Sequence, residues 1–320
     1  MNPYELRKKL VENVTKVMVG KEEIVDLILT SILCSGHILL EDIPGVGKTT
    51  LAKTVAKSLN LSFSRIQFTP DLLPSDVTGI NFYNPKISEF VFKKGPVMAN
   101  IVLADEINRA TPKTQSSLLE CMEERQVTVD GVTYPLEKLF LVIATQNPVE
   151  IQGTFPLPEA QLDRFLMKIK IGYPSFEEEI KIMERFEAQN PLDDLKSVLT
   201  SEDIFNAQKE IEKVYISREC KEYILNIITA TRNHKDIVLG ASPRASIALY
   251  KSAKAYAALK GRNYVIPDDI KYLSKFILPH RIILKSNLYL EGDPSNIVEE
   301  ILSEVACPVD DFSNKEGMNS

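Results

Sequence analysis

The sequence has few of the residues that build disulfide frameworks or metal cages. Among 320 residues there are four cysteines, three histidines and no tryptophan. The cysteines form no CxxC pair, and the histidines are scattered along the chain. We therefore expect no structural disulfides and no zinc site. Reduced thiols of this kind are typical of a cytoplasmic protein.

Long apolar runs and an excess of positive charge are also missing. No run of 18 apolar residues occurs, and the first 14 residues are charged and amphipathic, so we expect neither export nor a membrane span. The 38 basic and 44 acidic residues give a net charge of −6, which makes nucleic acid an unlikely partner. With 44% hydrophobic residues, the chain is long enough for about two domains with cores of their own.

The first half alternates short apolar runs with helical patterns, which is typical of a parallel sheet covered by helices. We predict an α/β domain over residues 1–172. Its strands are expected at residues 37–41, 61–67, 101–104, 140–144 and 165–171. Two antiparallel ribbons should interrupt this alternation, one at 127–134 around Asp130-Gly131 and one at 81–93 around an Asn-Pro turn.

The second half, residues 175–309, is rich in helix formers and helix start signals, which predicts an all-helical domain. Thr200 with Asp203 resembles a capping pair, and Ser217 precedes another periodic segment. Ser242-Pro243 and Pro267 can each begin a helix as well. Residues 310–320 are polar and aperiodic, and we expect a flexible tail there.

The segment EDIPGVGKTT, residues 41–50, follows the first expected strand and precedes a helical pattern, as a phosphate-binding loop does. Its glycines would let backbone amides surround phosphates, Lys48 would reach the β- and γ-phosphates of ATP, and Thr49 would ligate magnesium. Asp42 stands where the strict pattern has glycine, so this backbone position must suit other residues. The predicted ATP-binding residues of the loop are Pro44, Gly45, Val46, Gly47, Lys48, Thr49 and Thr50.

Two further strand ends carry polar residues. In IVLADEINRA, Asp105 would hold magnesium through water and Glu106 would polarise the attacking water. An Asp-Glu pair alone is usually a solvated loop, but together with a phosphate loop it favours ATP chemistry. In ATQNP, residues 144–148, Asn147 lies at a carboxyl strand end, where ligands bind in open parallel sheets, and it could orient the same water.

Five motifs, DIPGVGKT, LADEINRA, ATQNP, LPEAQLDRF and GASPRA, stand in the order and approximate spacing of one family, and together they resemble the MoxR family of AAA+ ATPases. The resemblance covers nearly the whole chain. It implies a five-stranded parallel sheet of order 5-1-4-3-2 and a helical lid. It also identifies residues 76–96 with the helix 2 insert and residues 127–134 with the pre-sensor 1 hairpin of that clade.

The resemblance assigns roles to three polar residues. Asn147 would be sensor 1, and Arg164 in LDRF would be the arginine finger that reaches the nucleotide of a neighbouring subunit. Arg244 in GASPRA would be the sensor 2 arginine, contacting the γ-phosphate of its own subunit. Taken alone, Arg164 would be read as a surface ion pair. Arg244 lies in the first turn of an expected helix, where the dipole does not favour a cation, so a partner anion is expected.

Two positions lie outside these motifs. By likeness to AAA+ chains, Val19 and Gly20 occupy the place that packs on adenine, although a plain turn between helices would give the same sequence. Gln67, at the end of the second expected strand, could restrain Glu106 until substrate binds.

The resemblance implies a ring, by family likeness a hexamer, that hydrolyses ATP and remodels or activates protein complexes, often with von Willebrand factor A domain partners. Two alternatives remain. A non-hydrolysing scaffold would keep the phosphate loop but lose Glu106 or the arginines, all of which are present. A DNA motor would need basic hairpins, whereas residues 127–134 carry no cation and residues 81–94 carry only three lysines.

Overall fold

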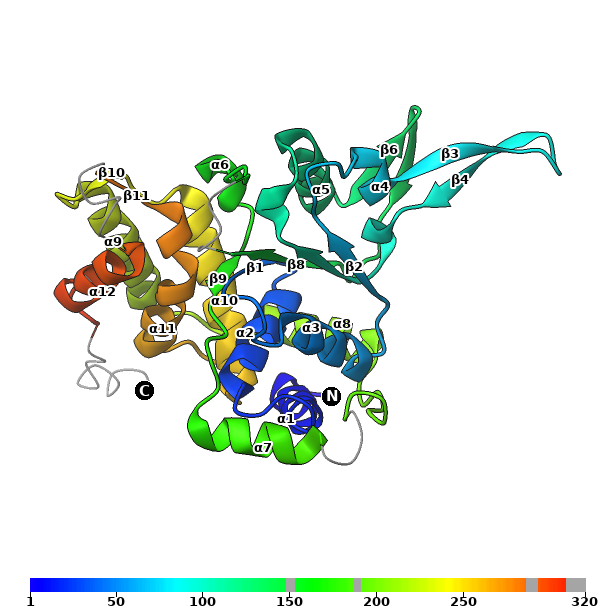
Figure 1. Ribbon diagram of the computed structural model, residues 1–320. Coiled ribbons are helices and arrows are strands. Elements are labelled where there is room, and N and C mark those ends of the chain that lie inside the picture. Colours follow the sequence, from blue (N-terminus) through cyan, green and yellow to red (C-terminus); the bar gives the residue numbers. More distant parts are fainter. Residues whose placement is uncertain (148–152, 187–190, 286–292, 309–320) are drawn as a thin grey trace, which may run out of the picture.

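A parallel sheet forms the centre of the α/β part of the molecule (Figure 1). This computed structural model describes residues 1–147, 153–186, 191–285 and 293–308, so the predicted tail at 310–320 and Pro148 of ATQNP lie outside the described residues. The sheet order is β2-β5-β8-β1-β9. When these five strands are numbered 1 to 5 along the chain and read from the β9 edge, the order is 5-1-4-3-2, which confirms the expectation. The strands are β1 (Ile38–Glu41), β2 (Phe63–Gln67), β5 (Ile101–Asp105), β8 (Leu141–Gln146) and β9 (Met167–Ile169).

Alternate side chains of the central strands enter two separate cores. Leu103 and Ile143 belong to one buried cluster, and Val102 and Val142 belong to the other. Helices cover both faces of the sheet, which is why the central strands are almost wholly apolar. The covering helices are α2 (Glu22–Leu33) and α3 (Lys48–Ser58) on the first face and α5 (Pro112–Glu124) on the second (Figure 1).

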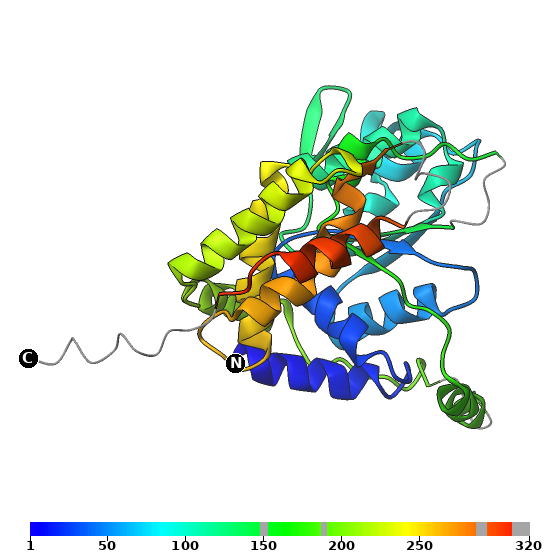
Figure 2. The ribbon, with the colours of Figure 1, turned by 90° about the vertical axis from the view of Figure 1, so that its left-hand side faces the viewer.

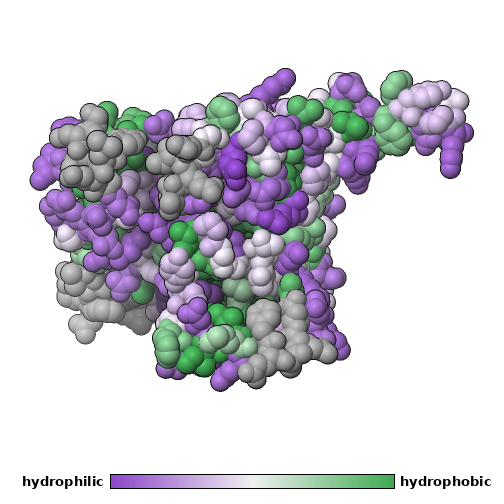
Figure 3. Space-filling model, viewed as in Figure 1, coloured by the Kyte–Doolittle hydropathy of each residue, from purple (hydrophilic) through white to green (hydrophobic). Residues whose placement is uncertain are grey.

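Two antiparallel ribbons extend from the α/β part. The first, preceded by α4 (Pro74–Thr78), projects away from the body of the molecule (Figure 3). The two ribbons touch, because the rings of Phe92 and Tyr134 stack with centroids 4.0 Å apart. Asn81 also donates a hydrogen bond of 2.8 Å to Asp130 at the tip of the second ribbon. The strands are β3 (Gly79–Asn84) with β4 (Glu89–Lys94), and β6 (Gln126–Val129) with β7 (Val132–Pro135).

The second half is dominated by helices that begin where the sequence predicts. Thr200 and Asp203 form a capping box, and Ser217 accepts a hydrogen bond from the backbone amide of Cys220. The expectation of an all-helical part is wrong in one detail: β10 (Ile237–Leu239) pairs antiparallel with β11 (Ile283–Leu284), and such short strands give no detectable alternation. The helices are α7 (Phe176–Phe186), α8 (Ser201–Glu212), α9 (Arg218–Asn233), α10 (Pro243–Leu259), α11 (Pro267–Ile277) and α12 (Pro294–Glu304).

The N-terminal helix α1 (Pro3–Val14) joins the two halves. Its Leu6 and Leu10 lie in one buried cluster with Ile204 and Ala207 of α8. Helix α7 is set apart from α9–α12 (Figure 2) and contacts the loop after α1. None of the helices in the described part of the chain combines the length and apolar character that a membrane span requires.

Candidate active site

The loop between β1 and α3 has the backbone shape of a phosphate-binding loop. Gly45 and Gly47 have φ angles of +88° and +87°, a region that glycine adopts without steric cost. A Cβ on Gly45 would meet no atom within 4 Å, so this part of the loop borders open space. Lys48 Nζ donates a hydrogen bond of 2.8 Å to the carbonyl oxygen of Asp42. The other predicted members, Pro44, Val46, Thr49 and Thr50, lie in the same loop or the first turn of α3.

Asp42 links this loop to the segment that follows β9. Its φ is not positive, so aspartate can stand where the strict pattern has glycine. The buried carboxylate accepts backbone hydrogen bonds of 2.5 Å from Ile171 and 2.8 Å from Gly172, both in the segment that follows β9. It also accepts one of 3.0 Å from Ile43. The phosphate loop is thereby fixed to the chain that leads into the second half of the molecule.

The carboxyl end of β5 holds the two predicted acidic residues in different settings. Asp105 Oδ1 accepts a 2.6 Å hydrogen bond from the hydroxyl of Thr145 at the end of β8. Glu106 has φ +55° and ψ +50°, a left-handed conformation that costs a non-glycine residue about 1–3 kcal/mol. The same Thr145 hydroxyl accepts a 2.8 Å hydrogen bond from the Glu106 amide, which stabilises this conformation.

Glu106 is held by side chains from two directions. Gln67 lies opposite Asp105 in the β2–β5 register and donates a hydrogen bond of 2.7 Å to Glu106 Oε2. This is the contact that the sequence suggested. Arg109 donates to the same oxygen at 3.1 Å. One oxygen of the Glu106 carboxylate is thus held by two side chains from different elements.

Sequence reasoning gave no role to Arg65 or Thr145. Arg65 donates hydrogen bonds of 2.6 Å to Asp105 Oδ2 and 2.8 Å to Gln67 Oε1. A period-two pattern could have revealed it, because Arg65 and Gln67 lie two residues apart on one face of β2.

The position expected to pack on adenine lies beside the phosphate loop. Val19 is buried, and Gly20 is exposed with φ +65°. A Cβ on Gly47 would lie 3.4 Å from the methyl carbon of Met18, so this segment and the phosphate loop are adjacent. A Cβ on Gly20 would collide with the carboxylate of Glu178 at the start of α7. Glycine is favoured here by its backbone angle, and a larger residue would also displace the Glu178 side chain.

Thr49, Asp105 and Asn147 all belong to the carboxyl edge of the sheet. Asn147 is 7% exposed and follows β8, whose Gln146 pairs with Glu41 just before the phosphate loop. Magnesium prefers oxygen ligands, usually keeps several waters, and takes only one or two protein carboxylates when phosphates supply the rest. The Thr49 hydroxyl and the Asp105 carboxylate fit this requirement. Both oxygens of Asp105 already accept hydrogen bonds, which suits binding through water.

The two predicted arginines lie elsewhere. Arg164, after α6 (Glu159–Leu162), is 3.3 Å from Glu123 at the C-terminal end of α5, and Arg244 forms an ion pair with the same carboxylate. This end of α5 lies at the amino edge of the sheet, since His37 before β1 contacts the backbone oxygen of Met122 at 3.2 Å. Residues 37–41 run from that edge to the phosphate loop and span about 17 Å, so the two arginines lie about that far from the loop.

The expectation that Arg244 contacts the γ-phosphate of its own subunit stays a prediction; in this structure its guanidinium pairs with Glu123 at the amino edge of the sheet. The second half docks at the amino edge through Asp163, which pairs with Arg281 at 2.7 Å and accepts a 3.1 Å hydrogen bond from Ser242. Ser242 is the N-cap of α10, so Arg244 is carried to that edge with it. Arg281 is 118 residues from Asp163 in sequence, and no sequence signal connects them.

Comparisons with known proteins agree with this geometry. Models of the ATPase family associated with various cellular activities (AAA) and of the AAA lid domain match residues 37–167 and 229–301. The chain is 55% identical over 307 residues to the uncharacterised protein YeaC of Bacillus subtilis, covering 96% of each. It is 41% identical over 311 residues to Chaperone MoxR1 of Mycobacterium tuberculosis, covering 94% of this chain and 82% of that relative. A crystal structure of a presumed ATPase from Cytophaga hutchinsonii matches with a TM-score of 0.89 at 45% identity, covering 96% of each chain. On the strength of these motifs, this fold and these relatives, the chain belongs to the MoxR family of AAA+ ATPases.

Proposed function

We propose that this chain hydrolyses ATP with magnesium and uses the cycle to remodel or activate protein complexes. The observation that carries the proposal is the gathering of the phosphate loop, Asp105 and Glu106 at one edge of the sheet, with Glu106 held by Gln67 at 2.7 Å. A relative of 41% identity is named a chaperone, which supports the class of activity. We place this activity in the cytoplasm, where free thiols such as those of this chain persist.

The residues of the carboxyl edge would have separate roles in ATP binding and hydrolysis. Backbone amides of the loop and of the first turn of α3 donate to the phosphates, while Lys48 exchanges the Asp42 carbonyl for phosphate oxygens. Thr49 and, through water, Asp105 would hold magnesium, which would supply neutralisation of phosphate charge. Glu106 polarises the attacking water once Gln67 releases it, and Asn147 orients that water.

The placement of the arginines supports a ring. Arg164 and Arg244 lie about one strand length from their own phosphate loop, so we propose that both reach the nucleotide of a neighbouring subunit. A closed ring supplies every site with such a neighbour, and likeness to the family favours a hexamer. Arginines supplied in this way raise rates by about 10³–10⁵ in the best-studied GTPases.

The ribbons are the proposed contact with the client, and a protein with a von Willebrand factor A domain is the proposed client. Apolar side chains are exposed along β3 and β4, among them Phe82, Tyr83 and Phe90. The stacking of Phe92 on Tyr134 would make the two ribbons move together. We further propose residues 1–172 as the nucleotide-binding domain and residues 175–309 as the lid.

Two variants test the site itself. Lys48→Ala should lose binding of a fluorescent ATP analogue, because its ammonium supplies the side-chain contact to the phosphates. Glu106→Gln should keep that binding and lose phosphate release, since an amide preserves shape but cannot accept a proton. Equal loss of binding and turnover in Glu106→Gln would contradict its role.

Mixing inactive subunits tests which arginines act across the interface. Arg164→Ala mixed with Lys48→Ala should regain ATPase activity, because some mixed sites combine an intact pocket with an intact arginine. The position of Arg244 predicts the same recovery for Arg244→Ala mixed with Lys48→Ala. A mixture of Glu106→Gln with Lys48→Ala should stay inactive and serves as the control. If only the Arg244→Ala mixture stays inactive, Arg244 acts within its own subunit.

A further inference from the structure

A cationic cleft lies at the amino edge of the sheet, where Arg164 and Arg244 meet the end of α5. Its charged lining has an excess of three positive charges, so the cleft favours an anion. The cationic side chains are Arg125, Arg164, Arg244, Lys251 and Arg281, and the anionic ones are Glu123 and Asp163.

The two carboxylates of this cleft are engaged differently. Asp163 is paired with Arg281, whose side chain is only 3% exposed, so this pair belongs to the buried contact between the two halves. Glu123 faces both Arg164 and Arg244, and all three side chains are between 31% and 50% exposed. Glu123 is thus the shared counter-ion of two arginines that solvent and a ligand can reach.

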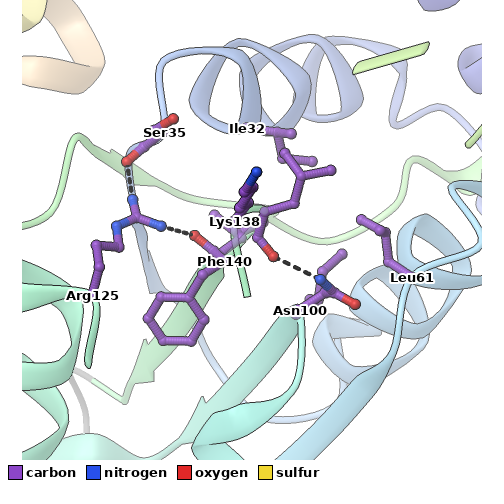
Figure 4. Close-up of a pocket in the computed structure, with 10 residues that line it drawn as sticks. Ile32, Ser35, Leu61, Asn100, Arg125, Lys138 and Phe140 are labelled. Atoms are coloured by element: carbon purple, nitrogen blue, oxygen red, sulfur yellow. Dashed lines mark hydrogen bonds between the residues drawn. The ribbon is translucent and has the colours of Figure 1, made fainter. Parts of the chain in front are cut away.

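Glu123 lies where the helix itself disfavours negative charge. Three of the last five residues of α5 are glutamates, Glu120, Glu123 and Glu124, and a carboxylate near a helix C-terminus is unfavourable because the helix dipole is negative there. The end of α5 is also fixed in place. Arg125 directly after it donates hydrogen bonds to the backbone oxygens of Ser35 and, at 2.7 Å, of Phe140 (Figure 4). The position of Glu123 is therefore stabilised by the two arginines rather than by its own helix.

We propose that Glu123 occupies, in the free subunit, the place taken in the ring by the phosphates of a nucleotide bound to a second copy of this chain. It is a positioning residue that holds Arg164 and Arg244 side by side, and it exchanges with the incoming polyphosphate during assembly. ATP carries one phosphate more than ADP, so ATP displaces Glu123 more effectively. This inference rests on the proposed function of the two arginines.

Assembly in the hydrolysis-deficient Glu106→Gln background tests the exchange without turnover. With saturating ATP and magnesium, sedimentation velocity gives the protein concentration at half-maximal ring formation. Adding Glu123→Gln removes two ion pairs that assembly must break, so this concentration should fall about twofold to tenfold. Glu124→Gln makes the same charge change one residue away and should not shift it.

A second comparison distinguishes the proposed role of Glu123 from a purely structural one. Assembly with and without Glu123→Gln is measured again in subunits that also carry Arg164→Ala and Arg244→Ala. Without the arginines, Glu123→Gln should no longer shift assembly. An unchanged or higher assembly concentration in Glu123→Gln, or an equal shift with and without the arginines, overturns the inference. Failure of both arginine variants to recover activity with Lys48→Ala would instead refute the proposed function.

Discussion

Asp42 provides a direct test of how the phosphate loop is anchored, because the strict loop pattern has glycine at this position. Asp42→Gly restores that pattern but removes the buried carboxylate. The backbone amides of Ile171 and Gly172 then lose acceptors at 2.5 Å and 2.8 Å, and Ile171 is only 5% exposed. We therefore expect the variant to be less stable than the natural sequence.

The magnitude follows from the number and kind of the lost bonds. Hydrogen bonds to a charged group contribute about 1.5–3 kcal/mol each, so losing the two that link the loop to the β9 segment destabilises the fold by about 3 kcal/mol or more. In a domain of 150–250 residues each kcal/mol shifts the melting temperature by about 2–4 °C, so Asp42→Gly should melt at least about 6 °C lower. Asp42→Asn keeps an acceptor for Ile171 and Gly172 but presents a donor to the Ile43 amide, and it should fall in between.

Thermal unfolding followed by circular dichroism, without nucleotide, measures this effect free of ligand linkage. Asp71→Gly is the matched control, since Asp71 is fully exposed and the change brings the same gain in unfolded-chain freedom. Its melting temperature should change little. If Asp42→Gly melts at or above the melting temperature of the natural sequence, the anchoring role of the carboxylate is refuted.

Two further predictions concern the catalytic restraint and the pH dependence of stability. Gln67→Ala removes the 2.7 Å hydrogen bond to Glu106, worth about 1 kcal/mol, so phosphate release without client should rise about fivefold; a fall would show that Gln67 assists rather than restrains Glu106. Burial, with a smaller effect of Arg125, lowers the pKa of His37 from 6.5 to about 3. The unfolded chain therefore binds more protons between these values, and His37 makes stability fall as pH decreases below 6.5, by about 1.4 kcal/mol per pH unit. Melting temperatures of His37→Gln should accordingly depend less on pH between about 6.5 and 5, and an unchanged dependence would contradict burial of a neutral imidazole.

Much of the α/β fold could be predicted because its signals are local. The strands β5 and β8 are buried on both faces, so their sequences are apolar runs that can be recognised. Thr200 and Ser217 mark the starts of their helices because their side chains cap the first turn. The contact between Gln67 and Glu106 was also foreseeable, since neighbouring parallel strands bring their carboxyl ends together. Arg65 was missed because an exposed arginine on a strand has many possible partners. The β2–β5 register sets Gln67 opposite Asp105, and Arg65, two residues earlier on the same face of β2, reaches Asp105 with its long side chain.

The position of Arg244 could not be predicted from its motif, and the reason is physical. Ser242-Pro243 determines that a helix begins there, but a helix start carries no information about which edge of the sheet it meets. That choice is made by contacts distant in sequence: Asp163 binds both Ser242 and Arg281, and α10 packs on α2 within the shared core. Local pattern thus identified Arg244 as a cation in need of an anion, whereas long-range packing determined that this anion is Glu123.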